Sequence, residues 1–530
     1  MTDLEKTSIE QTVPGDLHLG GLMAAVLAGL VVLWLPAPAD LPATAQRLIA
    51  VTVVMAILWL FQAVPVAVTS LLPLALYPLL GIVSASDVSA PYGNKNVFLF
   101  LGGFLIAMGL EKSGLHRRLA LHLVSRVGSG PIPIVFGFML TTAFLSMWIS
   151  NTASTMLMMP IALALLSTLR ESGKPGEFDR QIAQMNVPVL LGIAYGASCG
   201  GFATLIGTPT NVAFRGYWGD QFVAQGYANI SAAAWMLTFV PVSLIMILIV
   251  GAVLTWRLPR HSPLADLGRN FFRTRLQTLG TMNRSERIVA VLFTVTAVLW
   301  LTREPLIFDQ FQLLPGWTDL LASAGSQLGI DLSTVPEYVD DATIAVLMGV
   351  LLFFIPGEPA ENSARQPILT WSETESAMPW GMLILIGSGF AIARAFDKTG
   401  LSEWLGGRIS MVLEGQPLLV LTFGVCLFVT FLTEFTTNVA TLNTLLPVLA
   451  AVAVSLDVPP LMLLLPATIS ASCAFMFPVG TPPNAIVFGT GRVPMAQMAR
   501  YGLILNLLGV VVITAAMRYW VPLTIDLVRH

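Results

Sequence analysis

The sequence has few charged residues and no basic segment of the kind that binds nucleic acid. Only 11% of its 530 residues are Asp, Glu, Lys or Arg, the net charge is −3, and 55% are hydrophobic. Soluble domains carry roughly 25% charged residues. With a mean hydropathy of +0.78, this composition excludes a soluble domain and a nucleic-acid-binding protein, and it indicates an integral membrane protein.

Cysteine is also scarce. The three cysteines, Cys199, Cys426 and Cys473, all lie in apolar segments, which argues against a disulfide framework and against a metal cluster. The N-terminal stretch MTDLEKTSIEQTVPGD is acidic and polar, so it is not a secretory signal peptide, and we expect the first apolar helix to be retained.

Long apolar stretches are abundant. Segments of about 20 residues, the length that a helix needs to cross a bilayer, recur from Gly20 to the C-terminus. The sequence therefore predicts one all-α polytopic membrane domain over 1–530 with about eleven transmembrane helices. Two further apolar segments, 131–169 and 416–455, are too long for one helix and carry polar clusters near their middle, so each is expected to be a re-entrant hairpin. The predicted spans are 20–37, 47–63, 65–83, 96–110, 187–214, 232–256, 288–302, 341–356, 379–396, 458–487 and 501–525.

The distribution of Lys and Arg predicts the orientation. Segment 257–287 holds seven arginines against Asp266 and Glu286, whereas 304–340 has acidic residues and no Lys or Arg. By the positive-inside rule the first is expected to be cytoplasmic, as a solvated helix rather than a ligand site, and the second external. Counting crossings places the N-terminus inside and the C-terminus outside the plasma (inner) membrane.

The chain also repeats itself. GFLIAMGLEKSGL from Gly103 matches GFAIARAFDKTGL from Gly389, and SNTAST around Asn151 matches TNVATL around Asn438. ASCGGFATLIGTPTN from Ala197 matches ASCAFMFPVGTPPN in the second copy. The order is the same, and an odd number of predicted crossings separates the copies. We therefore expect two inverted-topology repeats, 96–256 and 379–525, which are typical of secondary transporters.

The polar clusters of each repeat predict the site. Non-helical backbone at membrane depth must be buried in protein or line a cavity. Such breaks expose helix N-termini, which suit anions, and carbonyls and hydroxyls, which suit a hard cation such as sodium. GTPTN (207–211) and GTPPN (480–484) predict two helices that unwind within the membrane, because proline blocks helix continuation. No Lys, Arg or His lies in these four elements, so anion binding is expected to depend on dipoles, amides and a bound cation.

Other interpretations of these residues were weighed. Ser, Thr and Asn in membrane helices often only bond neighbouring helices, although recurrence in register in both copies argues against this. GASCG (196–200) fits the nucleophile pattern of hydrolases with Ser198 as nucleophile, but the elbow belongs between a strand and a helix, and the five histidines lie outside the predicted core. Glu434, near the second hairpin tip, is a possible cation or proton site, and a structural hydrogen-bonding role is favoured.

These motifs resemble the divalent anion:sodium symporter family, which includes sodium-coupled dicarboxylate, citrate and sulfate transporters. The resemblance covers nearly the whole chain and implies a homodimer that carries its site across the membrane by an elevator-like movement. It implies a first sodium site at Ser146, Ser150, Asn151, Gly200 and Gly201, and a second at Thr433, Thr436, Asn438 and Met476. It implies substrate contacts from Asn151, Thr152, Asn438, Val439, Pro478, Thr208 and Thr481.

One position departs from the doubled SNT pattern of the family. Thr437, Asn438 and Val439 stand in the second copy, so Val439 lacks the hydroxyl that Thr152 has in the first. The resulting hypothesis is sodium-coupled import of a di- or tricarboxylate such as succinate, malate or citrate, by a transporter and not an enzyme. A sodium-independent dicarboxylate exchanger, a sulfate carrier and a passive channel remain as alternatives at this point.

Overall fold

The computed structural model describes residues 19–525 apart from 39, 128–129, 172–178, 260–263, 309–310, 329–330, 333 and 359–365. The N-terminal stretch 1–18, the last five residues and parts of the two charged segments used for orientation therefore lie outside the described residues. The predicted all-α class is confirmed, with one exception: a short antiparallel hairpin forms within the acidic segment.

Six short or medium elements precede the first repeat. The predicted span 65–83 is divided in two, because the chain turns at Ser70 and Leu71 between α3 and α4. These elements are α1 (Leu19–Trp34), α2 (Ala43–Phe61), α3 (Val66–Thr69), α4 (Leu72–Leu79), α5 (Ala85–Ser89) and the 3₁₀ helix η1 (Ala90–Gly93).

The first repeat begins at a capped helix. The Asn94 side chain accepts the N–H of Asn96 at the start of α6, and Gly114 ends that helix with a left-handed φ of 80°. The elements are α6 (Lys95–Ser113), α7 (Leu115–Val127), α8 (Pro131–Ser146), α9 (Asn151–Glu171), α10 (Asp179–Gly201), α11 (Pro209–Gln221), η2 (Val223–Gln225) and α12 (Ala232–Thr255).

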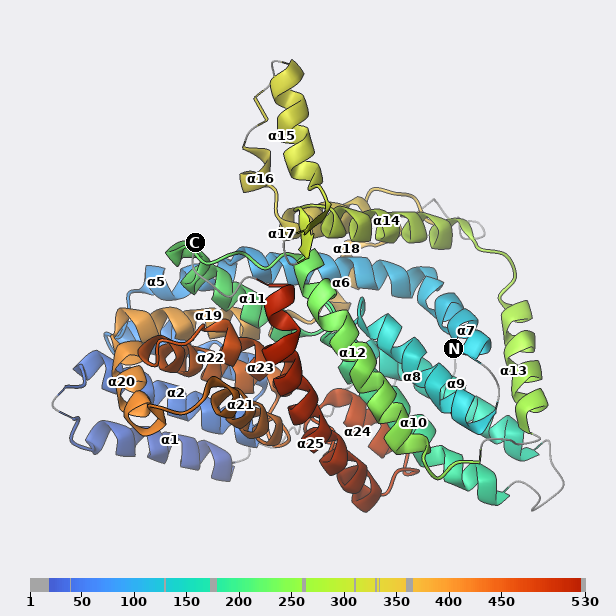
Figure 1. Ribbon diagram of the computed structural model, residues 1–530, viewed down its shortest axis with the longest axis horizontal. Coiled ribbons are helices and arrows are strands. Elements are labelled where there is room, and N and C mark those ends of the chain that lie inside the picture. The colour runs from blue at the N-terminus through green and yellow to red at the C-terminus, as the bar shows by residue number, and fades with distance from the viewer. Residues whose placement is uncertain are drawn as a thin grey trace.

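The region between the repeats holds both charged segments. The arginine-rich segment forms a helix, α13, as predicted, and α15 projects beyond the rest of the molecule (Figure 1). A capping box of Asn283 and Glu286 starts α14, and Asp340 caps α17. The elements are α13 (Leu264–Thr278), α14 (Arg284–Leu301), β1 (Leu306–Phe308), β2 (Phe311–Leu314), α15 (Trp317–Leu328), α16 (Val335–Tyr338), α17 (Asp341–Leu351) and α18 (Trp371–Ala377).

The second repeat follows the same order of elements as the first. In each, a long helix and a shorter one precede two interrupted helix pairs and a final long helix. The elements are α19 (Trp380–Lys398), α20 (Leu401–Leu413), α21 (Leu418–Leu432), α22 (Asn438–Ser455), α23 (Leu461–Ala471), α24 (Pro482–Gly489), α25 (Met495–Tyr519) and η3 (Val521–Leu523).

The number of long apolar helices differs from the number of apolar segments in the sequence. Within the described residues, eight helices are long and apolar enough to cross a membrane, and α20 with α21 forms a further pair bent by 113°. Several predicted spans are instead short helices or broken pairs, including 187–214 and 458–487. The figure of eleven crossings therefore stays a prediction.

Packing brings the interrupted elements of the two repeats together. α10 lies against α8, α9 and α12, and α25 lies against α12, α21 and α23, so these helices share one apolar core. Across the repeats, α11 packs on α22 and α23, while α24 packs on α9 and α10. The four breaks are thereby gathered in one region of the molecule.

Candidate functional site

Both SNT-type motifs lie at helix N-termini. α8 ends at Ser146 and α9 begins at Asn151, while α21 ends at Leu432 and α22 begins at Asn438. The hydroxyl before each asparagine caps its helix: Ser150 Oγ accepts the N–H of Ala153 (3.2 Å), and Thr437 Oγ1 accepts that of Ala440 (3.4 Å). The other N–H groups of each first turn have no partner within the helix, which gives both tips a partial positive charge.

At each tip a hydroxyl, an asparagine and a backbone carbonyl meet. Ser146 Oγ lies 2.5 Å from Asn151 Oδ1 and 2.8 Å from the carbonyl oxygen of Ala197. Thr433 Oγ1 lies 2.9 Å from Asn438 Oδ1 and 3.1 Å from the carbonyl oxygen of Ala471. We call these two sets of three residues the oxygen triads.

The two oxygen triads occupy equivalent places in the repeat, since Ala197 and Ala471 begin the matching ASC blocks. Both hydroxyl-bearing residues are fully buried. A hydroxyl has one proton and so can donate to only one of its two acceptor neighbours at a time. Each triad therefore presents buried oxygen lone pairs in excess of its protons, which is the donor set of a small hard cation.

The broken helices are held open by a second asparagine in each repeat. The Asn211 amide donates to the carbonyls of Thr204 (2.7 Å) and Gly201 (3.3 Å). The Asn484 amide donates to those of Ala474 (3.0 Å) and Phe477 (3.1 Å). These bonds satisfy carbonyls that the interrupted helix cannot, as non-helical backbone at membrane depth requires.

The half-helices α11 and α24 start in the same way. Each has proline at its first position, where the missing N–H costs nothing. The preceding residues, Thr208 and Thr481, are extended, with φ/ψ of −142°/143° and −143°/146°. Both are buried, and the Thr481 hydroxyl has no hydrogen-bond partner among the described residues. Two more helix N-termini are thus added to those of α9 and α22.

Two of the predicted glycines allow close contacts of different kinds. A Cβ on Gly201 would lie 2.4 Å from Asn151 Oδ1, so this glycine makes room for the first triad. A Cβ on Gly200 would lie 2.1 Å from the carbonyl oxygen of Ala143, so Gly200 permits α10 to pack on α8. The structure therefore brings Ser146, Asn151 and Gly201 together, with Gly200 directly behind them.

The remaining predicted residues are less tightly connected to the triads. The Thr436 hydroxyl bonds that of Thr441, and Thr152 and Pro478 are half-buried. Val439 is 4% exposed and belongs to an apolar cluster with α2 and α19 residues. Burial in that cluster places its side chain among apolar neighbours and not among the polar groups of the tip.

Glu434 is a hydrogen-bond acceptor for the second broken helix. Its Oε1 accepts the N–H groups of Phe475 (2.7 Å) and Met476 (2.9 Å), and its Oε2 accepts that of Phe477 (3.0 Å). The Asn506 amide on α25 donates a fourth bond to Oε1 (2.7 Å). The expected hydrogen-bonding role is confirmed, and it orients the backbone segment that includes Met476.

A buried ion cluster, not predicted from the sequence, lies beside α11. Arg215 Nη1 lies 2.9 Å from Asp341 Oδ2, as an ion-pair contact without the alignment of a hydrogen bond. Arg303 Nε donates to Asp341 Oδ1 (2.6 Å), and its Nη2 pairs with Glu304. The side chains of Arg215, Asp341 and Arg303 are 6%, 1% and 3% exposed. An arginine four residues after Asn211 within an apolar stretch was the signal that could have indicated it.

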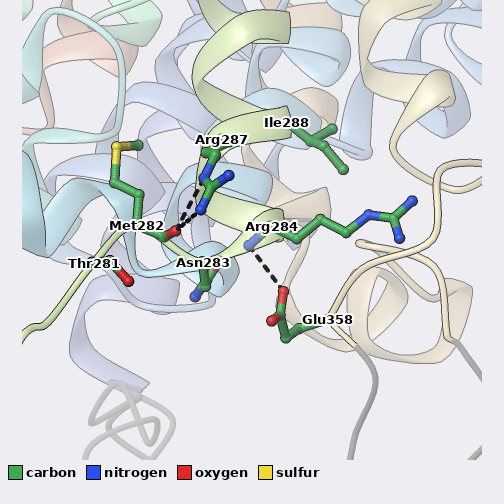
Figure 2. Close-up of a pocket in the computed structure, with 7 residues that line it drawn as sticks. All are labelled: Thr281, Met282, Asn283, Arg284, Arg287, Ile288 and Glu358. Carbon is green, nitrogen blue, oxygen red and sulfur yellow. Dashed lines mark hydrogen bonds between the residues drawn. The ribbon is translucent and has the colours of Figure 1, made fainter.

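Two other features do not provide a site. Ser198 lies inside α10, and its buried hydroxyl has no hydrogen-bond partner among the described residues, so the hydrolase arrangement is missing there. The pocket in Figure 2, about 670 Å³, lies at the start of α14 and contains none of the predicted residues. There, the guanidinium of Arg287 donates to the Met282 carbonyl (3.1 and 2.9 Å), and Glu358 accepts the backbone N–H of Arg284 (2.9 Å).

Comparison with known proteins identifies membrane transporters that are similar to this chain. The sodium-dependent dicarboxylate transporter SdcS of Staphylococcus saprophyticus is 38% identical over 506 residues, covering 95% of this chain and 92% of the relative. SdcS of Staphylococcus aureus (strain USA300) is 36% identical over 515 residues, covering 96% and 92%.

Solved structures share the fold at low identity. The YdaH transporter of Alcanivorax borkumensis aligns with a TM-score of 0.54 and 16% identity, covering 82% of this chain and 87% of that one. MtrF of Neisseria gonorrhoeae aligns with a TM-score of 0.50 and 15% identity, covering 95% and 94%. A family model described as the sodium:sulfate symporter transmembrane region matches residues 17–525. The chain therefore belongs to the divalent anion:sodium symporter family, a family of membrane transporters and not of enzymes.

Proposed function

We propose that the protein is a sodium-coupled symporter that imports dicarboxylates. The observation that carries the proposal is the doubled oxygen triad, Ser146–Asn151–Ala197 and Thr433–Asn438–Ala471, at the N-termini of α9 and α22. The names of the SdcS relatives, which are 36–38% identical over nearly the whole chain, support the same substrate and ion.

In this proposal each triad holds one sodium ion. Ser146, Ser150, Asn151, Gly200 and Gly201 line the first site. The second site would use Thr433, Thr436, Asn438 and the backbone at Met476. The oxygens are neutral, so a bound cation adds a full positive charge beside the helix N-termini. Sodium then raises the affinity for an anion, and the anion raises the affinity for sodium by the same factor.

The substrate would lie between the two tips. Its carboxylates would contact Asn151 and Thr152 on one side, Asn438 and Pro478 on the other, with Thr208 and Thr481 beside the starts of α11 and α24. Val439 is the remaining residue of the substrate-binding set predicted from the sequence. A dianion with a carboxylate at each end matches two N-terminal tips that come from two repeats. Asn side chains supply two donors each for such a carboxylate.

The wider organisation is proposed on the same basis. The repeats 96–256 and 379–525 are related by inversion within one membrane domain over 1–530. The mobile part comprises α8–α12 and α21–α25, which carry the four breaks, and it moves as an elevator against a fixed part of α1–α6, α14, α17 and α19. The protein is a homodimer in the plasma (inner) membrane, with the arginine-rich segment cytoplasmic, the acidic segment external, the N-terminus inside and the C-terminus outside.

Uptake by proteoliposomes tests this function. Purified protein would be assayed with radiolabelled succinate under an inward sodium gradient or an equal potassium gradient, with unlabelled malate, citrate and sulfate as competitors. We expect saturable uptake only with sodium, lost in Asn151→Ala and in Asn438→Ala. Uptake that ignores sodium but needs internal dicarboxylate would identify an exchanger, and competition by sulfate alone would identify a sulfate carrier.

A further inference from the structure

The half-helix α11 is closed against the fixed part of the molecule along an apolar seam. Val212 of α11 is completely buried in a cluster with α6 and α19 residues. One turn on, a Cβ at Gly216 would lie 1.9 Å from the ring of Phe390, so the two helices are in direct contact. We call this cluster the α11 seam; its members are Val97, Phe100, Val212, Leu383, Ile386 and Phe390.

The equivalent half-helix in the second repeat has a different environment. Every residue of α11 from Thr210 to Trp218 is buried, whereas α24 exposes Pro482, Ala485 and Gly489. α24 packs on α9 and α10, which belong to the proposed mobile part, while α11 packs on α6 and α19, which belong to the fixed part. One half-helix of the pair is therefore engaged with the fixed part and the other is not.

The ion cluster of Arg215, Asp341 and Arg303 adjoins the α11 seam, since Arg215 lies between Val212 and Gly216 on α11, and it crosses the same boundary. Arg215 belongs to α11, Arg303 follows α14, and Asp341 is the first residue of α17. A hydrogen bond from Asn94 Nδ2 to Asp220 Oδ2 (2.7 Å) crosses it nearby, from the cap of α6 to the end of α11.

The ion cluster can separate without leaving a charged side chain of the fixed part unpaired. Asp341 is bonded to Arg303 independently of Arg215, and Arg303 also pairs with Glu304. When α11 withdraws, Asp341 keeps a counter-charge and only Arg215 moves into water. The closed state, in contrast, needs Asp341, because a buried guanidinium without a partner is strongly unfavourable.

We propose that Arg215, Asp341 and Arg303 form an ion-pair latch that holds the α11 seam closed, and that releasing it is a step of the transport cycle. This proposal rests on the proposed function for the division into mobile and fixed parts. The latch lies on the side of the acidic segment 304–340, because Asp341 directly follows that segment. It stabilises the state in which the site is closed towards that side.

Labelling of a reporter thiol in the α11 seam tests the latch. Val212→Cys places a thiol where it is covered while the seam is closed, and the native cysteines, which are buried, give the background rate. A membrane-impermeant maleimide would be applied in proteoliposomes, with orientation determined separately. We expect Asp341→Asn to raise the labelling rate about tenfold, because Arg215 then loses its counter-charge only in the closed state.

Two further variants make the test specific. Asp340→Asn is the matched control: Asp340 is the neighbouring residue, pairs with Lys95 (3.3 Å) inside the fixed part and interacts with Arg215 only at longer range, and asparagine caps a helix as well as aspartate. Labelling should therefore rise much less than in Asp341→Asn. Adding Arg215→Met to Asp341→Asn removes the unpaired buried charge and should slow labelling relative to Asp341→Asn, although the ion pair itself is still absent. General loosening of the fold would leave the double variant as fast as the single one.

The outcomes are distinguishable. Equal rates for Asp340→Asn and Asp341→Asn, or no recovery in the double variant, would overturn the latch. If Asp341→Asn does not give folded protein, Arg215→Met removes the ion pair while Asp341 keeps Arg303, and labelling no faster than the parent would also overturn the latch. If the labelling results support the latch but the protein shows no sodium-driven succinate uptake, the proposed function is refuted and the latch is not.

Discussion

The two broken-helix regions of the molecule share one set of contacts and differ in another. Both hold an oxygen triad, and both use an asparagine, Asn211 or Asn484, to satisfy the carbonyls of the interruption. They differ in what binds the N–H groups of the interruption. In the second region the carboxylate of Glu434 accepts three consecutive backbone N–H groups.

The first region has no carboxylate at the equivalent place, where Met147 stands. Instead, the Thr204 hydroxyl donates to the Met147 carbonyl and accepts the N–H of Gly207 (3.1 Å). The triads of the proposed ion sites are present twice, whereas the contacts present once only support the backbone. The two regions therefore share the same kind of oxygen triad, although different side chains support the backbone beside it.

Among changes that act on only one of the two regions, removal of Glu434 should cause the largest loss of stability. Glu434→Ala leaves three backbone N–H groups and the Asn506 amide without their acceptor in a buried site, so we expect a loss of about 3 kcal/mol or more in the free energy of unfolding. The matched change in the first region, Met147→Leu, keeps the backbone carbonyl that Thr204 uses and should cost less than about 1 kcal/mol. Unfolding in detergent measures both, and equal losses would contradict this account.

The next largest difference is expected at the glycines of the two GTP motifs. A Cβ on Gly207 would lie 2.4 and 2.8 Å from the backbone oxygens of Gly201 and Ser146, whereas one on Gly480 would meet Ala474 Cβ at 2.9 Å and Glu434 Oε2 at 3.3 Å. Gly207→Ala should therefore cost about 3 kcal/mol and most of the uptake, and Gly480→Ala about 1 kcal/mol. Thermal unfolding and initial uptake rates would be compared, and a more severe Gly480 variant would refute the assignment.

Asn211 and Asn484 should give equal effects. Each amide donates two bonds to the carbonyls of its own interruption, so replacing either by alanine is expected to cost about 1–2 kcal/mol. The two losses should agree within about 0.5 kcal/mol and should add in the double variant, if the sites are independent. Losses that differ several-fold in chemical unfolding would show that only one amide supports its break.

The sequence predicted those parts of the site that depend on local spacing. Ser146 and Thr433 each lie five residues before their asparagine, and the structure brings each pair into contact. Proline within GTPTN and GTPPN predicted the starts of α11 and α24. Proline cannot continue a preceding helix, but it is favoured at the first position of a new one.

Contacts between distant segments could not be predicted in this way. The triad carbonyls of Ala197 and Ala471 carry no side-chain signal, and the ion pair of Arg215 with Asp341 joins two segments whose packing only the fold determines. The continuity of the helices could not be predicted for the opposite reason: apolar composition runs continuously through 458–487, although the helix within it is interrupted. Hydropathy reports burial in an apolar medium, not the continuity of a helix.

Substitution of Val439 is expected to have the smallest effect on transport. Comparison with the equivalent substitution of Thr152 would distinguish the two tips. The residue is buried among apolar side chains, while Thr152 at the equivalent place is half-buried, and its hydroxyl makes no hydrogen bond within the described residues. If a hydroxyl at position 439 cannot reach the substrate, Val439→Thr should change the half-saturating succinate concentration by less than about twofold. Thr152→Val should raise it about tenfold, the usual effect of losing one hydrogen bond to a charged group. A large gain of affinity in Val439→Thr would instead place this side chain in the site, and the two tips would then differ in substrate contact and not only in support.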